Sequence, residues 1–128
     1  MRIYLAGPMT GLPDHNIPAF DAAAKRLREQ GHFVINPADL SAQFGTPEDI
    51  AYLFKILYGI EGKGDGVWEY HNQQAKLAQS IMDADLAAVR SCDAIYLLRG
   101  WEMSRGAKKE LAEAIKCGLE VRQEGGEE

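Results

Sequence analysis

The sequence lacks any long hydrophobic run, and this excludes one class of protein at the outset. No apolar stretch approaches the roughly 20 residues that a membrane-spanning helix needs, and Met1 leads straight into a strand-like segment instead of a signal peptide. Basic residues are also fewer than acidic ones: the chain has 14 Lys and Arg and 19 Asp and Glu, which gives a net charge of −5. This balance argues against a general nucleic-acid-binding surface, although it leaves room for a small local phosphate pocket. We therefore expect a protein that acts away from membranes and from DNA or RNA polymers.

Cysteine and histidine are scarce as well. Cys92 and Cys117 share no metal-type spacing with each other or with the three histidines, so no metal site is predicted. Two cysteines in a chain without an export signal are typical of reduced thiols in the core and of the cytoplasm. The histidines at 15, 32 and 71 form no Ser-His-Asp pattern, and we assign them no function.

The chain does contain an alternation of strand and helix patterns, over a length of 128 residues that suits one domain. A helical crossover between the first two strands implies that they pair in parallel. The pattern predicts an α/β fold with a doubly wound parallel sheet of four to five strands. We expect a single domain over 1–122 and a disordered tail over 123–128. The expected strands cover 2–7, 32–37, 93–98 and 118–122, and the expected helices about 18–30, 70–91 and 104–117.

Residues 38–69 are the least legible part of the chain. The segment "PEDIAYLFKILYGI" (47–60) is compatible with a helix, and "EGKGDG" (61–66) predicts a turn. These glycines form no phosphate loop, because no strand precedes them and no Lys-Ser or Lys-Thr pair follows. The segment is either a plain surface loop or a lid over a pocket.

Two loops leave buried strands at their carboxyl ends, where ligands bind in open α/β sheets. They are "GPMTG" (7–11) and "RGWEMS" (99–104). If the two strands are neighbours, both loops overhang one crevice.

The helix that follows the second loop carries a carboxylate beside its apolar stripe. Ser104 is well placed as the N-cap, and Gly106 permits close approach of a ligand to the first N–H groups, which attract anions. Glu110 falls just beside the stripe, so it either faces the crevice or pairs with a nearby lysine on a plain surface helix. The stripe consists of Ala107, Leu111, Ala114 and Ile115.

The preceding helix carries a second carboxylate within its apolar face. Asp85 projects between Ile81 and Val89, and a carboxylate there is costly unless it is hydrogen-bonded or lines a cavity. It either lines the crevice or, structurally, caps a loop or pairs with an arginine such as Arg99. Asp93 fits a structural turn. The buried face is expected to comprise Leu77, Ile81, Ala84, Ala88 and Val89.

A tyrosine in the first strand completes the set of candidates. Tyr4 is either core filler or a phenol that reaches the pocket and hydrogen-bonds a carboxylate. Two carboxylates and a phenol around a crevice suit glycosyl chemistry, in which one carboxylate attacks an anomeric carbon and a second acidic group positions the sugar or assists the leaving group.

Three segments in this order resemble the nucleoside 2-deoxyribosyltransferase-like superfamily, which includes nucleoside 5-monophosphate N-glycosidases. They are "IYLAGPMTG", "DLAAVRSCDAIYLL" and "GWEMSRGAKKELAEA", within the first 40 residues and roughly 80 to 120. The resemblance implies a flavodoxin-like or Rossmann-like fold and cleavage of the bond between base and sugar through a covalent glycosyl-enzyme. It places Glu110 as the nucleophile, Asp85 at the sugar hydroxyls or the leaving base, Tyr4 as the residue that orients Glu110, and Gly7 at the close-approach position of the first loop.

The resemblance also suggests how the rest of the substrate is held. Ser104 stands where the monophosphate hydrolases carry a serine and the nucleoside transferases an aspartate, which favours a nucleotide. Those hydrolases place an arginine where this chain has Thr10, so phosphate recognition stays open, with Arg99 and Arg105 as candidates to take the place of that arginine. We expect Ser104, Thr10 and the backbone around Gly7 and Gly106 to hold the 5′ end of the substrate. Met9 and Trp101 either sandwich the base or are partly exposed packing residues.

The resulting expectation is an enzyme that hydrolyses, or transfers across, the N-glycosidic bond of a (deoxy)nucleotide or nucleoside. No cofactor or metal is expected, and the resemblance implies a homo-dimer or larger homo-oligomer. Two alternatives remain: a non-catalytic nucleotide-binding or sensing module on the same fold, and a protein-interaction domain with a vestigial crevice.

Overall fold

The computed structural model describes residues 1–9, 12–46, 48–50, 52–53 and 68–125. Over these residues the chain alternates strands and helices in the expected order. The elements are β1 (Arg2–Ala6), the 3₁₀ turn η1 (Pro13–Asn16), α1 (Ile17–Glu29), β2 (Phe33–Ile35), α2 (Pro37–Ser41), the 3₁₀ turn η2 (Ala42–Phe44), α4 (Trp68–Arg90), β3 (Ala94–Leu97), the 3₁₀ turn η3 (Trp101–Met103), α5 (Arg105–Lys116) and β4 (Glu120–Gln123).

The described strands form one sheet in the order β2-β1-β3-β4, and every pair in it is parallel. This confirms the expected doubly wound α/β fold. The chain runs outward from β1 to β2 and then returns to β3 on the opposite side of β1, so the strand order reverses between β1 and β3. Ala6 and Leu97 are register partners at the carboxyl ends of these two strands. The loops after β1 and β3 therefore leave the sheet side by side, at the place where open α/β sheets bind ligands.

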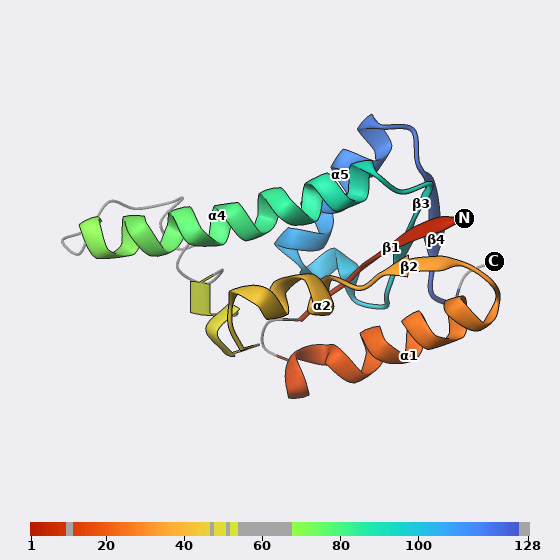
Figure 1. The fold of residues 1–128 in the computed structure, drawn as a ribbon, viewed down its shortest axis with the longest axis horizontal. Helices are drawn as coiled ribbons and strands as arrows, with labels where there is room; N and C mark the ends of the chain where they lie inside the picture. The colour runs from red at the N-terminus through yellow and green to blue at the C-terminus, as the bar shows by residue number, and fades with distance from the viewer. Residues whose placement is uncertain (10–11, 47, 51, 54–67, 126–128) are drawn as a thin grey trace.

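Helices cover both faces of the sheet, and this explains why its central strands are apolar throughout. Figure 1 shows α1 on one side of the sheet and α4 with α5 on the other. Successive side chains of a strand point to opposite faces. Ile3 and Leu5 of β1 pack with the buried residues of α1, whereas Tyr4 and Ala6 pack with the end of α4 and with α5. Both faces of β1 are therefore core, as expected for a parallel sheet.

The buried stripe of α5 differs from the one that apolarity alone predicts. The residues of α5 that are buried are Ala107, Glu110 and Ala114, so Glu110 lies within the stripe and not beside it. Ile115, which we expected to face the sheet, is 62% exposed. The stripe is centred on the line 107–110–114, and this rotation turns Ile115 toward solvent.

The buried face of α4 follows the prediction only where the sheet lies behind the helix. Ile81 and Val89 are buried as expected, but Leu77 is 40% exposed. Figure 1 shows that the half of α4 nearest Trp68 extends past the sheet. The position of Leu77 on the helix is apolar, but among the described residues no layer covers it.

Other expectations need correction at the ends of elements. Pro37 is expected to end a strand, but it also begins α2, where Asn36 accepts a hydrogen bond from the N–H of Ala38 at 3.1 Å.

The two cysteines and the C-terminal tail also differ from expectation. Cys92 is buried, whereas Cys117 is exposed and is not a core thiol. The expected tail begins late, because β4 runs to Gln123 and the N–H of Glu124 donates to the carbonyl of Leu97 at 2.8 Å.

Part of the remaining chain cannot be compared with the predictions. The possible helix over 47–60 lies mostly outside the described residues, and the predicted turn over 61–66 lies outside them entirely. Within the described part of the chain, none of the helices combines the length and the apolar character that crossing a membrane requires.

The different burial of two isoleucines gives a direct test of this packing. Ile95 of β3 is fully buried. We expect Ile95→Ala to lower the free energy of unfolding by about 2–5 kcal/mol, because it removes buried methylene groups and leaves a cavity. The same change at exposed Ile115 should alter it by less than about 0.5 kcal/mol. Urea unfolding of both variants measures the difference, and equal losses would show that α5 is rotated from the position described.

Candidate active site

A cavity of about 330 Å³ lies at the carboxyl ends of β1 and β3. The loop after β1 contributes Gly7, Pro8 and Met9 to its lining, and the loop after β3 contributes Met103 and Ser104. The start of α5 contributes Arg105, Gly106, Ala107 and Glu110. Both loops therefore overhang one cavity, as the sequence predicts for neighbouring strands. Its volume is at the lower end of the range for small-molecule sites, which is roughly 300–1,000 Å³.

Glycine at position 7 allows the two loops to run this close together. A Cβ atom on Gly7 would lie 2.8 Å from the Cβ of Leu98, which is closer than two carbon atoms can pack. Gly100 has a φ of +86°, a left-handed conformation that glycine adopts freely, and it turns the chain after β3 toward the start of α5. The loop geometry at the cavity thus depends on two small residues without side chains.

Glu110 reaches the cavity from the second turn of α5 and is 6% exposed. The phenol of Tyr4, fully buried in β1, donates a hydrogen bond to Glu110 Oε2. The structure therefore pairs Glu110 with Tyr4. Burial raises the pKa of Glu110 well above its usual range, the charge of Asp85 raises it further, and the hydrogen bond from Tyr4 lowers it.

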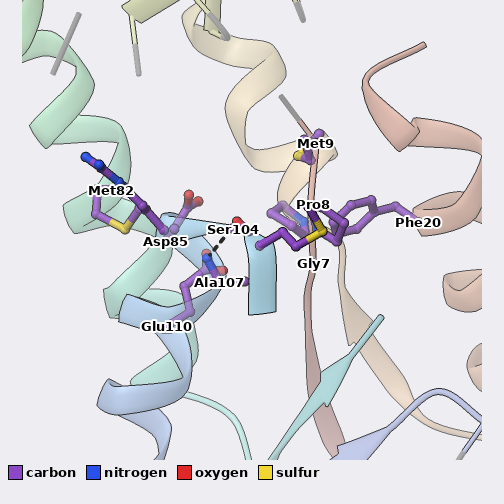
Figure 2. Close-up of a pocket in the computed structure, with 13 residues that line it drawn as sticks. Gly7, Pro8, Met9, Phe20, Met82, Asp85, Ser104, Ala107 and Glu110 are labelled. Carbon is purple, nitrogen blue, oxygen red and sulfur yellow. Dashed lines mark hydrogen bonds between the residues drawn. The ribbon is translucent and has the colours of Figure 1, made fainter. Parts of the chain in front are cut away.

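Asp85 reaches the same cavity from α4 and is 7% exposed. Its Oδ1 is buried and has no hydrogen-bond partner among the residues that the structure describes. Burial raises the pKa of this carboxyl group to about 7, so a proton stays on Asp85 at pH values where an exposed aspartate has lost it. Figure 2 shows Asp85, Met82 and Glu110 on one side of the cavity.

Tyr4 is part of the same electrostatic unit. Burial raises the pKa of its phenol well above the usual value, and the charges of Glu110 and then Asp85 raise it further. The phenol therefore keeps its proton and remains a hydrogen-bond donor to Glu110. Both carboxyl groups therefore have raised pKa values and one of them is held by a phenol; enzymes use pairs of carboxyl groups as nucleophile and acid.

The start of α5 forms the polar end of the cavity. Ser104 caps the helix as predicted, because its Oγ accepts a hydrogen bond from the N–H of Ala107 at 3.1 Å, drawn as a dashed line in Figure 2. The serine hydroxyl can still donate its own hydrogen. Gly106 and Arg105 line the cavity in the same turn. The helix dipole and the first-turn N–H groups thus make this end favourable for an anion.

Apolar side chains form most of the remaining lining. Pro8, Met9 and Phe20 lie on the side of the cavity opposite Asp85 and Glu110 in Figure 2. Met82 and Pro37 line it as well. A pocket with two carboxyl groups, one anion-ready end and an apolar side suits a ligand that combines hydroxyl groups, an anionic group and a flat hydrophobic ring.

The structure brings together most of the residues that the sequence singles out. Gly7, Met9, Asp85, Ser104, Gly106 and Glu110 line the cavity, with Tyr4 behind Glu110. Trp101 is not among the lining residues and packs against the core cluster that contains Tyr4 and Ala107, which is the packing position that the sequence left open for it. Thr10 lies outside the described residues.

Sequence reasoning missed several lining residues, most of them apolar. Phe20 fits the core face of its helix, and hydropathy does not distinguish a core position from a cavity wall. Of the two arginines that could replace the one missing at position 10, Arg105 lines the cavity and Arg99 does not. The missed residues are Pro8, Phe20, Pro37, Met82, Met103 and Ala107.

Asp93 has the structural function that its position before a strand suggests. Its Oδ2 accepts a hydrogen bond from the N–H of Arg2 at 2.8 Å, at the opposite end of the sheet from the cavity. Across the described residues, no group of three or more His, Cys, Asp or Glu side chains is arranged to hold a metal ion.

Comparison with known proteins places the chain in a family without assigning a reaction. A sequence model of the family described as "Domain of unknown function (DUF4406)" matches residues 1–62 and 59–123. No curated protein gives a significant match.

The raised pKa of Asp85 predicts a pH-dependent cost in stability. The folded state keeps a proton that the unfolded chain releases above about pH 4, so unfolding becomes more favourable as the pH rises from about 4 to about 7. We expect Asp85→Asn, which is neutral at every pH, to raise the free energy of unfolding by up to about 4 kcal/mol at pH 8 relative to the native chain. At about pH 4 the two proteins should differ little.

Urea unfolding at both pH values measures this difference. Asp83→Asn is the matched control, because Asp83 is an exposed carboxylate on the same helix and should give no such gain. If Asp85→Asn raises the free energy of unfolding equally at both pH values, the raised pKa of Asp85 is contradicted.

Proposed function

The chain belongs to the DUF4406 family, a domain of unknown function, and from its pocket we propose that it cleaves the N-glycosidic bond of a (deoxy)nucleoside 5′-monophosphate or nucleoside. The observation that carries this proposal is the pairing of Tyr4 with Glu110 beside a second buried carboxyl group, Asp85, in one cavity. The resemblance of the same residues to the nucleoside 2-deoxyribosyltransferase-like superfamily supports it. The apolar side of the cavity takes the base, and the start of α5 takes the 5′ end.

In the first step Glu110 attacks the sugar. Tyr4 holds Oε2 of Glu110, which leaves Oε1 to form a bond to C1′. The bond between C1′ and the base nitrogen breaks, and its electron pair goes to the base. Asp85 supplies the proton that the leaving base takes up, which requires its carboxyl group to be protonated at neutral pH.

In the second step the glycosyl-enzyme breaks down. The Asp85 carboxylate takes a proton from water, and the water oxygen bonds to C1′ and displaces Glu110. A second base in place of water gives transfer instead of hydrolysis. Two displacements at C1′ retain the configuration of the sugar.

The energetic cost of the pocket favours catalysis over passive binding. A buried carboxyl oxygen without a partner among the described residues destabilises the fold, and binding a ligand hydroxyl does not require the raised pKa that this burial produces. An acid that must hold its proton at neutral pH requires such an environment. Under this proposal the protein is a cytoplasmic homo-oligomer that needs no metal or organic cofactor.

Replacement of the nucleophile tests the proposal. We expect Glu110→Gln to lower the rate of base release about a thousandfold or more, because the amide cannot form the glycosyl ester. The assay incubates the protein with a panel of ribo- and deoxyribonucleosides and their 5′-monophosphates and measures liberated base by chromatography. Adding a second free base and searching for an exchanged nucleoside separates transfer from hydrolysis.

Glu113→Gln is the control on the same helix. Its carboxylate pairs with Arg90 Nη1 at 3.4 Å, away from the cavity, so base release should stay at the native rate. Native activity in Glu110→Gln, with an unchanged circular dichroism spectrum, would rule out the mechanism. Nucleotide binding by calorimetry without any base release by the native protein would indicate the non-catalytic module instead.

Removal of the Tyr4 hydroxyl should change the pH dependence of the reaction. The hydrogen bond from Tyr4 lowers the pKa of Glu110, and Glu110 must be ionised to attack. Tyr4→Phe therefore raises that pKa, and the acid limb of the kcat profile should move to higher pH. Tyr96→Phe, at another fully buried tyrosine, should leave the profile in place. An unshifted acid limb in Tyr4→Phe would show that the phenol does not act on the ionisation of Glu110.

A further inference from the structure

Three consecutive residues after β1 adopt a backbone conformation that side chains disfavour. Asp14, His15 and Asn16 have φ angles of +50°, +54° and +60°. Residues other than glycine enter this left-handed region rarely and usually singly, and a run of them persists only where surrounding contacts hold it. His15 supplies one such contact, because its Nε2 lies 3.5 Å from Oε1 of Glu48.

Asn16 occupies the N-cap position of α1 but does not cap the helix. Asparagine is among the best N-cap residues, because its side-chain oxygen normally accepts a hydrogen bond from an N–H of the first turn. Here the side chain makes no cap hydrogen bond, and a proline occupies the first turn of α1, where it removes one of the N–H donors. The amide instead donates from Nδ2 to the carbonyl oxygen of Pro8 at 2.9 Å.

This hydrogen bond fixes the loop that forms one side of the cavity. Pro8 lies between Gly7 and Met9, and all three line the cavity. In Figure 2 they lie across from Asp85 and Glu110. The backbone N–H of Leu12 also donates a hydrogen bond to the carbonyl of Met9 at 3.3 Å, but that bond joins backbone atoms. The bond from Asn16 to Pro8 comes from a side chain, so a substitution can remove it. The position of this loop therefore sets the distance between the apolar side and the two carboxyl groups.

We propose that Asn16 is a positioning residue that holds the loop after β1 at the spacing required for substrate binding. It is not among the lining residues, so it acts through Pro8 and Met9 without touching the reacting atoms. The left-handed turn aims its amide at Pro8. The assignment rests on the proposed function, because it takes the cavity as the substrate site.

The test compares two replacements of Asn16 with a control in the same turn. Asn16→Gly removes the amide and fits the left-handed backbone freely. Asn16→Asp keeps the size and the tolerance for this backbone, but an ionised carboxylate cannot donate to the Pro8 carbonyl. Asp14→Gly introduces glycine at φ +50° and leaves the amide of Asn16 in place.

For the nucleotide that gives base release, both Asn16 variants should raise KM about tenfold, the effect of losing one hydrogen bond, with kcat changed less than about twofold. Asp14→Gly should keep the native KM. A purely structural contribution would lower the melting temperature and leave the KM of the folded variants unchanged. A native KM in Asn16→Gly, or an equal rise in Asp14→Gly, overturns the proposal.

Failure of the proposed function gives a different result. If the native protein binds nucleoside 5′-monophosphates in calorimetry but releases no base, the same variants should weaken Kd about tenfold by the same argument. Unchanged Kd values in both Asn16 variants would overturn the positioning assignment alone. If the native protein neither binds nor cleaves any member of the panel, both proposals fall.

Discussion

The burial of two carboxyl groups beside one phenol is the constraint on which the rest of the site depends. Glu110, Asp85 and Tyr4 come from α5, α4 and β1, and none of them has more than 7% of its surface exposed. Low dielectric surroundings make the ionised form of each carboxyl group expensive, and their proximity prevents both from being ionised cheaply. One proton stays on the pair near neutral pH as a result.

The topology explains why residues so far apart in the chain meet. Because the strand order reverses between β1 and β3, the chain leaves these two strands in different directions, and among the described residues no crossover helix fills the space above their carboxyl ends. Close approach at Gly7 and the turn at Gly100 bring the two loops to the edges of that space. Helix α5 then starts at the cavity, so one helix supplies both the N-terminal end that suits an anion and the carboxylate that we propose as the nucleophile. A single switch point thereby assembles the whole candidate site.

The sequence predicts the parts of this structure whose physical cause is local or periodic. Unbroken apolar runs indicate strands that are buried on both faces, and Ser104 is recognisable as a helix cap. The pattern of apolar residues does not predict burial correctly where burial depends on which element packs against a helix. Helix α4 has 23 residues and is about 35 Å long, whereas β3 has 4 residues and spans about 13 Å, so Leu77 has no sheet to face. Helix α2 could have been predicted, because Asn36 followed by Pro37 is a typical helix start. The position of Phe20 in the cavity lining could not have been predicted, because hydropathy is the same for a core residue and a cavity wall. For the same reason the sequence could not choose between packing and base binding for Trp101.

Peptide mass spectrometry after acid quench tests the central claim most directly, that Glu110 becomes bonded to the sugar. The protein is mixed with excess of the nucleotide that gives base release, quenched within the first turnover and digested. The account predicts that the peptide containing Glu110 gains the mass of the sugar phosphate less one water, while the base appears free in solution. Release of base with no modified Glu110 peptide, or an adduct on another residue, would contradict it.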